Sequence, residues 1–110
     1  MKLFLHFLLR KLNLKLSRYS TSQRKKVSNF LNTIKNKKKL ENTNKFLPYF
    51  CSQFGQDLFV LNELNFKKNG FFVEFGATNG INSSNTYLLE DKFNWRGILA
   101  EPAKIFHNEL

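Results

Sequence analysis

The stretch Phe71-Phe72-Val73-Glu74-Phe75-Gly76-Ala77-Thr78-Asn79-Gly80 decides the fold of this 110-residue chain. Its first five residues are mostly apolar, with aromatic and β-branched side chains, and they predict a strand. The two glycines then predict a turn in which the backbone can approach a ligand. A second predicted strand, residues 97–100, ends in Glu101. An acid about 20 residues after such a turn is placed to hold ribose hydroxyls, so the layout predicts a nucleotide-type half-site.

Predicted helices flank both strands. Apolar spacing and capping residues place these helices at residues 56–66, 86–92 and 103–110. The order helix, strand, helix, strand, helix is the opening of a doubly wound α/β domain. In such a parallel sheet we expect strand 71–75 to be buried on both faces.

The spacing of the turn glycines bears on the class of cofactor. Gly76 and Gly80 form G-x-x-x-G, whereas the dinucleotide fingerprint requires a glycine where this chain has Thr78. A ligand that needs no tight pyrophosphate cradle therefore fits better, and a nicotinamide-binding half-domain is the less favoured alternative.

Two acids frame the turn, Glu74 before it and Glu101 after it. A carboxylate beside a buried strand end is costly unless it is paired or bound to a ligand. We therefore expect both acids to lie at neighbouring carboxyl ends of a parallel strand pair and to face one crevice.

The charge of the chain is concentrated in its N-terminal half. Residues 1–50 hold 13 Lys and Arg and one acid, whereas residues 51–110 hold five Lys and Arg and seven acids. The net charge of +10 therefore describes the N-terminal arm, and the basic run 35–39 lacks the interleaved aromatics of a nucleic-acid interface. We expect no specific nucleic-acid partner.

Within this arm, residues 1–17 predict a basic amphipathic helix. Such a helix either lies on an anionic membrane surface or packs on the body of the protein or on a partner. Residues 18–44 predict either a solvated linker or a weak, polar-faced helix. We place the domain boundary after residue 45, with a partial cofactor-binding domain over 46–110.

Sparse cysteine and histidine restrict the chemistry further. Cys51 is the single cysteine, and with only His6 and His107 beside it the sequence predicts neither an internal disulfide nor a metal site. The apolar start, residues 3–9, is far shorter than the roughly 20 residues that span a bilayer. We expect a cytoplasmic protein, with residues 1–17 offering weak contact to a membrane surface.

Four motifs in order resemble one enzyme family. The motifs are Ser52-Gln53-Phe54-Gly55-Gln56-Asp57, Asn69 to Gly80, Ser84-Asn85-Thr86-Tyr87-Leu88-Leu89-Glu90, and Trp95-Arg96-Gly97-Ile98-Leu99-Ala100-Glu101-Pro102. Together they closely resemble the front of FkbM-type S-adenosylmethionine-dependent methyltransferases. The resemblance covers about half the chain, residues 52–110.

The resemblance implies a Rossmann-like class I methyltransferase fold that transfers a methyl group to a hydroxyl of a sugar, glycan or natural product. It implies S-adenosyl-L-methionine as cofactor, with Glu101 on the ribose hydroxyls and Pro102 on the adenine side. Glu74 and Gly76 would lie at the methionine end, Ala77 and Gly80 would complete the turn, and Asn85 and Thr86 would lie near the same pocket. It assigns no catalytic base.

Only two strands of that fold are predicted, so we expect the chain to be a truncated front part, with two parallel strands, flanking helices and a basic helical arm. The acceptor pocket would then lie beyond Leu110. Such a fragment, whether a truncated gene product or half of a split enzyme, would bind cofactor poorly and be inactive alone. The alternative is a small basic protein that associates with membrane or nucleic acid and keeps a remnant nucleotide-binding fold.

Overall fold

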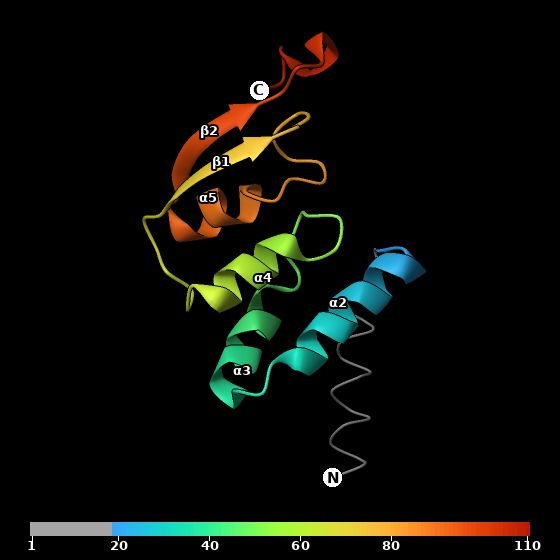
Figure 1. Cartoon of the computed structure of the whole chain (residues 1–110), viewed down its shortest axis with the longest axis vertical. Helices are drawn as coiled ribbons and strands as arrows, with labels where there is room; N and C mark the ends of the chain where they lie inside the picture. The colour runs from blue at the N-terminus through green and yellow to red at the C-terminus, as the bar shows by residue number, and fades with distance from the viewer. Residues whose placement is uncertain (1–18) are drawn as a thin grey trace.

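Two parallel strands, β1 (Phe71–Phe75) and β2 (Arg96–Ala100), lie at one end of the computed structural model, which describes residues 19–110 (Figure 1). Within these residues the chain is a small α/β domain. Its helices are α2 (Thr21–Thr33), α3 (Lys37–Phe46), α4 (Gln56–Glu63), α5 (Tyr87–Phe93) and the 3₁₀ helix η1 (Lys104–Phe106). The helix predicted over residues 1–17 lies outside the described residues.

The register of the strands brings their carboxyl ends to the same edge of the sheet. Phe71 is level with Arg96, and Phe75 is level with Ala100. Gly97 lies opposite Phe72, where a Cβ atom would collide with the Phe72 carbonyl oxygen and ring. Glycine at 97 therefore allows the buried Phe72 ring to lie against β2.

Helix α5 connects the two strands and covers the inner face of the sheet (Figure 1). Its side chains Leu88, Leu89 and Phe93 are buried in the core. The helix ends at Asn94, which adopts the left-handed conformation common at helix C-termini. The predicted succession of strand, helix and parallel strand is confirmed.

Helices α2 and α3 occupy most of residues 19–44, so of the two interpretations of this segment the helical one is confirmed and the linker one is wrong. Ser20 and Gln23 make a reciprocal capping box at the start of α2, with hydrogen bonds of 2.9 and 3.2 Å. Asn36 caps α3 by accepting a hydrogen bond from the Lys39 backbone N–H at 2.9 Å. Local capping thus begins both helices.

Tertiary burial holds these basic helices against the rest of the chain. Val27 and Leu31, four residues apart on α2, belong to the same hydrophobic core as Phe50 and Leu58. On α3, the fully buried Thr43 hydroxyl accepts a hydrogen bond from Asn62 at 3.1 Å. The core therefore extends across residue 45. No helix in the part of the chain from residue 19 onward combines the length and apolar content needed to span a bilayer.

Two predicted helices are shorter than expected. Helix α4 ends at Glu63 instead of residue 66, because Asn65 and Phe66 adopt left-handed backbone conformations. The helix expected over residues 103–110 is a single 3₁₀ turn that buries none of its side chains. Without an apolar face against the core, this segment lacks the packing that stabilises most short helices.

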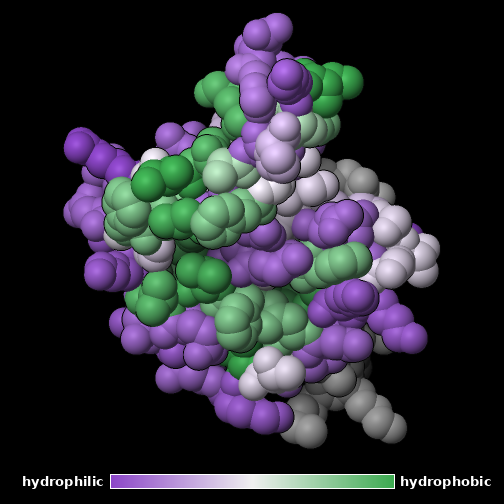
Figure 2. Space-filling model, turned by 45° about the horizontal axis from the view of Figure 1, so that its top comes forward, coloured by the Kyte–Doolittle hydropathy of each residue, from purple (hydrophilic) through white to green (hydrophobic). Residues whose placement is uncertain are grey.

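The strand β1 is buried on one face, not on two as expected. Phe72 and Glu74 point toward the helices, whereas Phe71, Val73 and Phe75 are exposed. Ile98 of β2 pairs with Val73 and is exposed as well. Figure 2 shows hydrophobic surface over this part of the molecule. Among the described residues no element covers this outer face, and its side chains alternate with buried ones along the strand.

Candidate functional site

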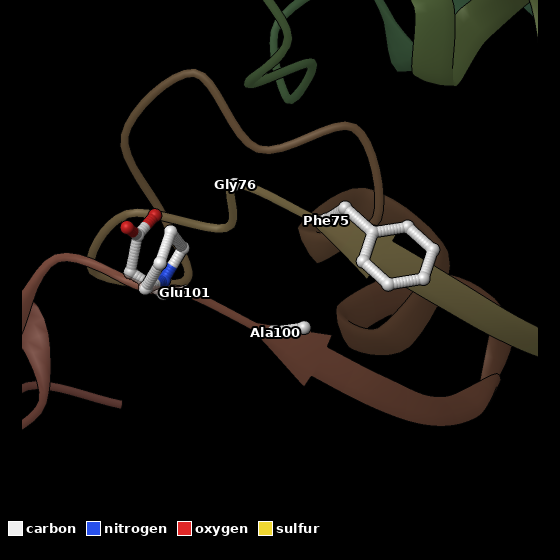
Figure 3. Close-up of a pocket in the computed structure, with 5 residues that line it drawn as sticks. Phe75, Gly76, Ala100 and Glu101 are labelled. Carbon is white, nitrogen blue, oxygen red and sulfur yellow. The ribbon is translucent and has the colours of Figure 1, made fainter.

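An open hollow lies at the carboxyl ends of the two strands. It is lined by Phe75, Gly76, Ala100, Glu101 and Pro102 and has a volume of about 630 Å³. Figure 3 shows these residues where the arrows of β1 and β2 end and the loops begin. Ligand pockets commonly measure about 300–1,000 Å³ and, in open α/β sheets, lie outside the carboxyl ends of the strands. Position and size therefore make this hollow the candidate site.

The turn after β1 exposes its backbone to the hollow. Gly76 has φ +72°, and a Cβ atom there would meet nothing within 4 Å. Gly76 therefore supplies both the left-handed conformation and an approach to the main chain. The backbone N–H groups of Gly76 and Ala77 donate to the Ala100 carbonyl at 2.7 and 3.3 Å, which fixes the turn against the end of β2.

Gly80, the second turn glycine, is placed differently. It also has a left-handed φ, +78°, but a Cβ atom there would lie 3.2 Å from Leu110 and 3.4 Å from Leu99. Its missing side chain serves the packing of the turn against the protein's own leucines. The structure therefore gives the two glycines separate roles.

The Glu101 carboxylate is partly exposed and held by backbone donors. The Thr78 N–H donates to Oε2 at 2.7 Å, and the Ala103 N–H donates to Oε1 at 2.8 Å. In Figure 3 this carboxylate points toward the loop that follows Gly76. An ionised carboxylate has about four acceptor positions, so Glu101 retains acceptor capacity for hydroxyl donors of a ligand.

Glu74 lies on the buried side of β1, and its carboxylate does not line the hollow. It accepts hydrogen bonds from the Ser84 hydroxyl at 3.1 Å and from the Asn85 backbone N–H at 2.8 Å. The Thr86 hydroxyl makes a third, short hydrogen bond to it. The expectation that both acids face one crevice is therefore wrong for Glu74, because alternation along the strand turns residues 72 and 74 inward.

The sequence-predicted site residues thus fall into two groups. Gly76, Glu101 and Pro102 line the hollow. Glu74 lies behind it in a buried cluster with Thr86, and it also accepts a hydrogen bond from the backbone N–H of Asn85, whose side chain is exposed. Ala77 and Gly80 belong to the loop that joins the two groups.

That loop, residues 76–86, is folded by its own polar side chains. Asn79 accepts hydrogen bonds from the backbone N–H groups of residues 81 and 82, at 3.1 and 2.9 Å. The Thr78 hydroxyl donates to the Asn82 carbonyl at 3.0 Å. The Ser84 hydroxyl accepts from the N–H of Tyr87, the first residue of α5, at 2.9 Å. Hydrogen bonds among its own residues therefore hold the loop together.

Sequence reasoning missed the roles of Thr78 and Ser84. Thr78 was considered only as a departure from the dinucleotide fingerprint, yet its N–H orients Glu101. Ser84 stands among several capping candidates at residues 82–85, and no local signal selects it. The useful signal would have been its two-residue distance from Thr86, since both hydroxyls reach the same buried carboxylate.

A second buried carboxylate, Asp57, lies at the start of α4. It accepts hydrogen bonds from the Ser52 hydroxyl at 2.6 Å and from backbone N–H groups of Cys51, Ser52 and Leu58 at 2.8 to 3.3 Å. Burial raises the pKa of the Asp57 carboxyl above its ordinary value of 3.8, although the hydrogen bond from Ser52 and those from the backbone act in the opposite direction. Asp57 and Ser52 belong to the first motif quoted above, where no role was assigned to them.

Comparisons with known proteins identify no similar protein. No family model matches the sequence, and neither a curated protein nor a solved structure is significantly similar to the chain. The function is therefore argued from the residues and their arrangement.

Proposed function

We propose that the hollow at the carboxyl ends of β1 and β2 binds S-adenosyl-L-methionine, and that this chain supplies the cofactor-binding part of an FkbM-type methyltransferase. The acceptor class would be a hydroxyl of a small molecule or glycan. In this proposal the β1–α5–β2 unit is the front part of a Rossmann-like class I methyltransferase fold. The support comes from the site geometry together with the resemblance of the four sequence motifs.

The observation that carries the proposal is that Glu101 and Gly76 line the same hollow. One is a carboxylate fixed by two backbone donors with acceptor capacity to spare. The other is a main-chain position with open space where a side chain would be. Nucleoside ligands of open α/β sheets use this combination, an acid on the ribose and a close backbone approach at the first turn.

The lining residues fit a nucleoside cofactor that carries no pyrophosphate. Glu101 would accept hydrogen bonds from both ribose hydroxyls, and Pro102 and Phe75 offer apolar surface for the base. Thr78 stands where a dinucleotide site would need glycine, which supports a cofactor without a pyrophosphate. When bound, the cofactor would supply a methyl group on a sulfonium centre, and the chain's part is to bind and orient it.

Ligand titration followed by NMR tests the proposal with the full chain. Addition of S-adenosylhomocysteine to millimolar concentration should shift the amide signals of residues 76–80 and 101–103. Millimolar concentrations suit the weak affinity that we expect. NAD should produce no comparable shifts.

Two variants make the titration specific. Glu101→Gln should abolish the shifts, because an amide can accept from only one of its two terminal atoms. Glu109→Gln changes an exposed acid nearby and should leave the titration unaltered. Shifts that persist in Glu101→Gln, or equal shifts with NAD, would contradict the proposal.

A further inference from the structure

The buried Asp57 carboxylate immobilises the chain segment that precedes α4. Its Oδ1 accepts from the Ser52 hydroxyl at 2.6 Å, and its Oδ2 accepts from the N–H of Cys51 at 2.8 Å and of Ser52 at 3.3 Å. Asp57 is fully buried, and Ser52 is 1% exposed. Residue 52 is therefore held through its side chain and its backbone at once.

Ser52 in turn contacts the loop of the candidate site. It forms an isolated parallel β-bridge with Ser83, which lies 31 residues further along the chain. Ser83 directly precedes Ser84, whose hydroxyl donates to Glu74. The end of the loop is therefore attached to β1 on one side and, through Ser52, to α4 on the other.

We propose that Asp57 and Ser52 are positioning residues for the loop 76–86. Their contacts keep residue 83 in place, and through the loop they keep Thr78 in place to orient the Glu101 carboxylate. Neither residue is among those that line the hollow. The effect on ligand affinity rests on the proposed function, whereas the effect on the loop does not.

The contacts of Ser52 determine how readily the loop 76–86 opens. Amide hydrogens exchange through local openings whose free energy is set by the contacts that must break. The bridge to Ser52 resists such an opening only while Ser52 itself is fixed. Removal of the hydroxyl that donates to the buried Asp57 carboxylate should therefore loosen residues 77–86 selectively.

The test compares two variants that each remove one buried hydroxyl. Ser52→Ala removes the donor to Asp57, and Thr43→Val removes the hydroxyl that joins α3 to Asn62, away from the loop. Both should lower the unfolding temperature. Only Ser52→Ala should accelerate hydrogen exchange of residues 77–86, by about tenfold relative to Thr43→Val, since it loses the buried hydrogen bond that fixes residue 52.

The same two variants are then titrated with S-adenosylhomocysteine. Ser52→Ala should bind several-fold more weakly than Thr43→Val. Asp57→Asn provides a second variant with the same expected pattern if Ser52→Ala does not fold. Equal exchange of residues 77–86 in the loop variants and in Thr43→Val would overturn the inference. A wild-type chain that fails to bind would contradict the proposed function but leave the exchange comparison decisive for the loop.

Discussion

The surroundings of Glu74 and of Glu101 show how one residue type takes two roles at the ends of neighbouring strands. Glu74 is 6% exposed and is surrounded by two hydroxyls and a backbone N–H from residues 84–86. Glu101 is partly exposed and is held by two backbone N–H groups beside an open hollow. The first carboxylate holds residues 84–86 of the protein together, and the second lines the hollow.

The difference follows from the direction of each side chain and from its donors. A buried carboxylate needs donors from the protein itself, because an unpaired charge in the interior is strongly unfavourable. A partly exposed carboxylate can keep acceptor positions for a ligand because water satisfies them in its absence. A strand-end acid is therefore a binding candidate only when its side chain leaves the core.

The largest expected effect is the loss of stability when the buried Glu74 carboxylate is replaced. Glu74→Gln should lower the free energy of unfolding by about 3 kcal/mol, because an amide nitrogen would replace a carboxylate oxygen that buried hydroxyls contact. Glu101→Gln should lower it by less than about 1 kcal/mol, since solvent can reach its donors. Urea unfolding of both variants measures the difference.

Glu63→Gln is the matched control for these two variants. Glu63 is exposed at the end of α4, and its replacement should change the free energy of unfolding by less than about 0.5 kcal/mol. If Glu74→Gln proved no more destabilising than Glu63→Gln, the buried cluster would not have the role described here.

A smaller loss of stability is expected from substitution of Gly76, which lines the hollow. A second glycine on a left-handed backbone, Gly55, separates the effect of backbone strain from the effect on ligand access. Gly76→Ala and Gly55→Ala both place a side chain on a left-handed backbone, at φ +72° and +83°, and each should cost about 1–2 kcal/mol. At Gly76 the added methyl group would also enter the hollow, whereas at Gly55 it would contact Val27 of α2 at 3.2 Å.

Titration of these two glycine variants with S-adenosylhomocysteine completes the comparison. Only Gly76→Ala should weaken binding, because only its methyl group stands where the main chain meets the ligand. Equally weakened ligand binding in both variants would show that binding follows overall stability. That result would contradict the assignment of the hollow as the binding site.

The smallest expected effect extends the comparison to a third carboxyl group, Asp57. Its pKa is raised by burial above 3.8, so the folded chain binds this proton more tightly than the unfolded chain does. The contribution of Asp57 to the free energy of unfolding is then greatest below pH 3.8 and falls as the pH rises from 3.8 through the raised value.

Denaturant unfolding across this pH range, for the wild type and Asp57→Asn, measures that contribution. The difference in free energy of unfolding between the two should decrease with rising pH and become constant above the raised pKa. A difference that increases with pH would mean that the hydrogen bonds to Asp57 outweigh its burial.

The strand and turn assignments could be read from local sequence because their causes are local. Residues 71–75 form β1 as predicted, and the glycines that end it adopt the left-handed conformations expected of a turn. The short helix before β2 was likewise predicted to within one residue, since its capping and apolar residues lie within it. The coarse α/β architecture followed from this order.

The errors came from residues whose state depends on distant parts of the chain. Polar composition around residues 18–44 left a linker and a weak helix as alternatives. Burial of Val27 and Leu31 in the same core as Phe50 and Leu58 gives helix α2 a place in the fold. Ser52 lacked an assigned role because its bridge partner Ser83 lies 31 residues further along the chain, and burial of Asp57 depends on the fold around it. No window of local sequence contains both sides of these contacts.

The sequence by itself determined where the strands, the glycine turn and the two acids lie along the chain, because apolar patterning and turn chemistry act over a few residues. Tertiary structure alone decided which acid is buried and which lines the hollow. That choice depends on which side of the sheet the helices cover, and α5 covers the side toward which Glu74 points. Packing of α5 on the sheet thus separated a buried carboxylate from one that lines the hollow.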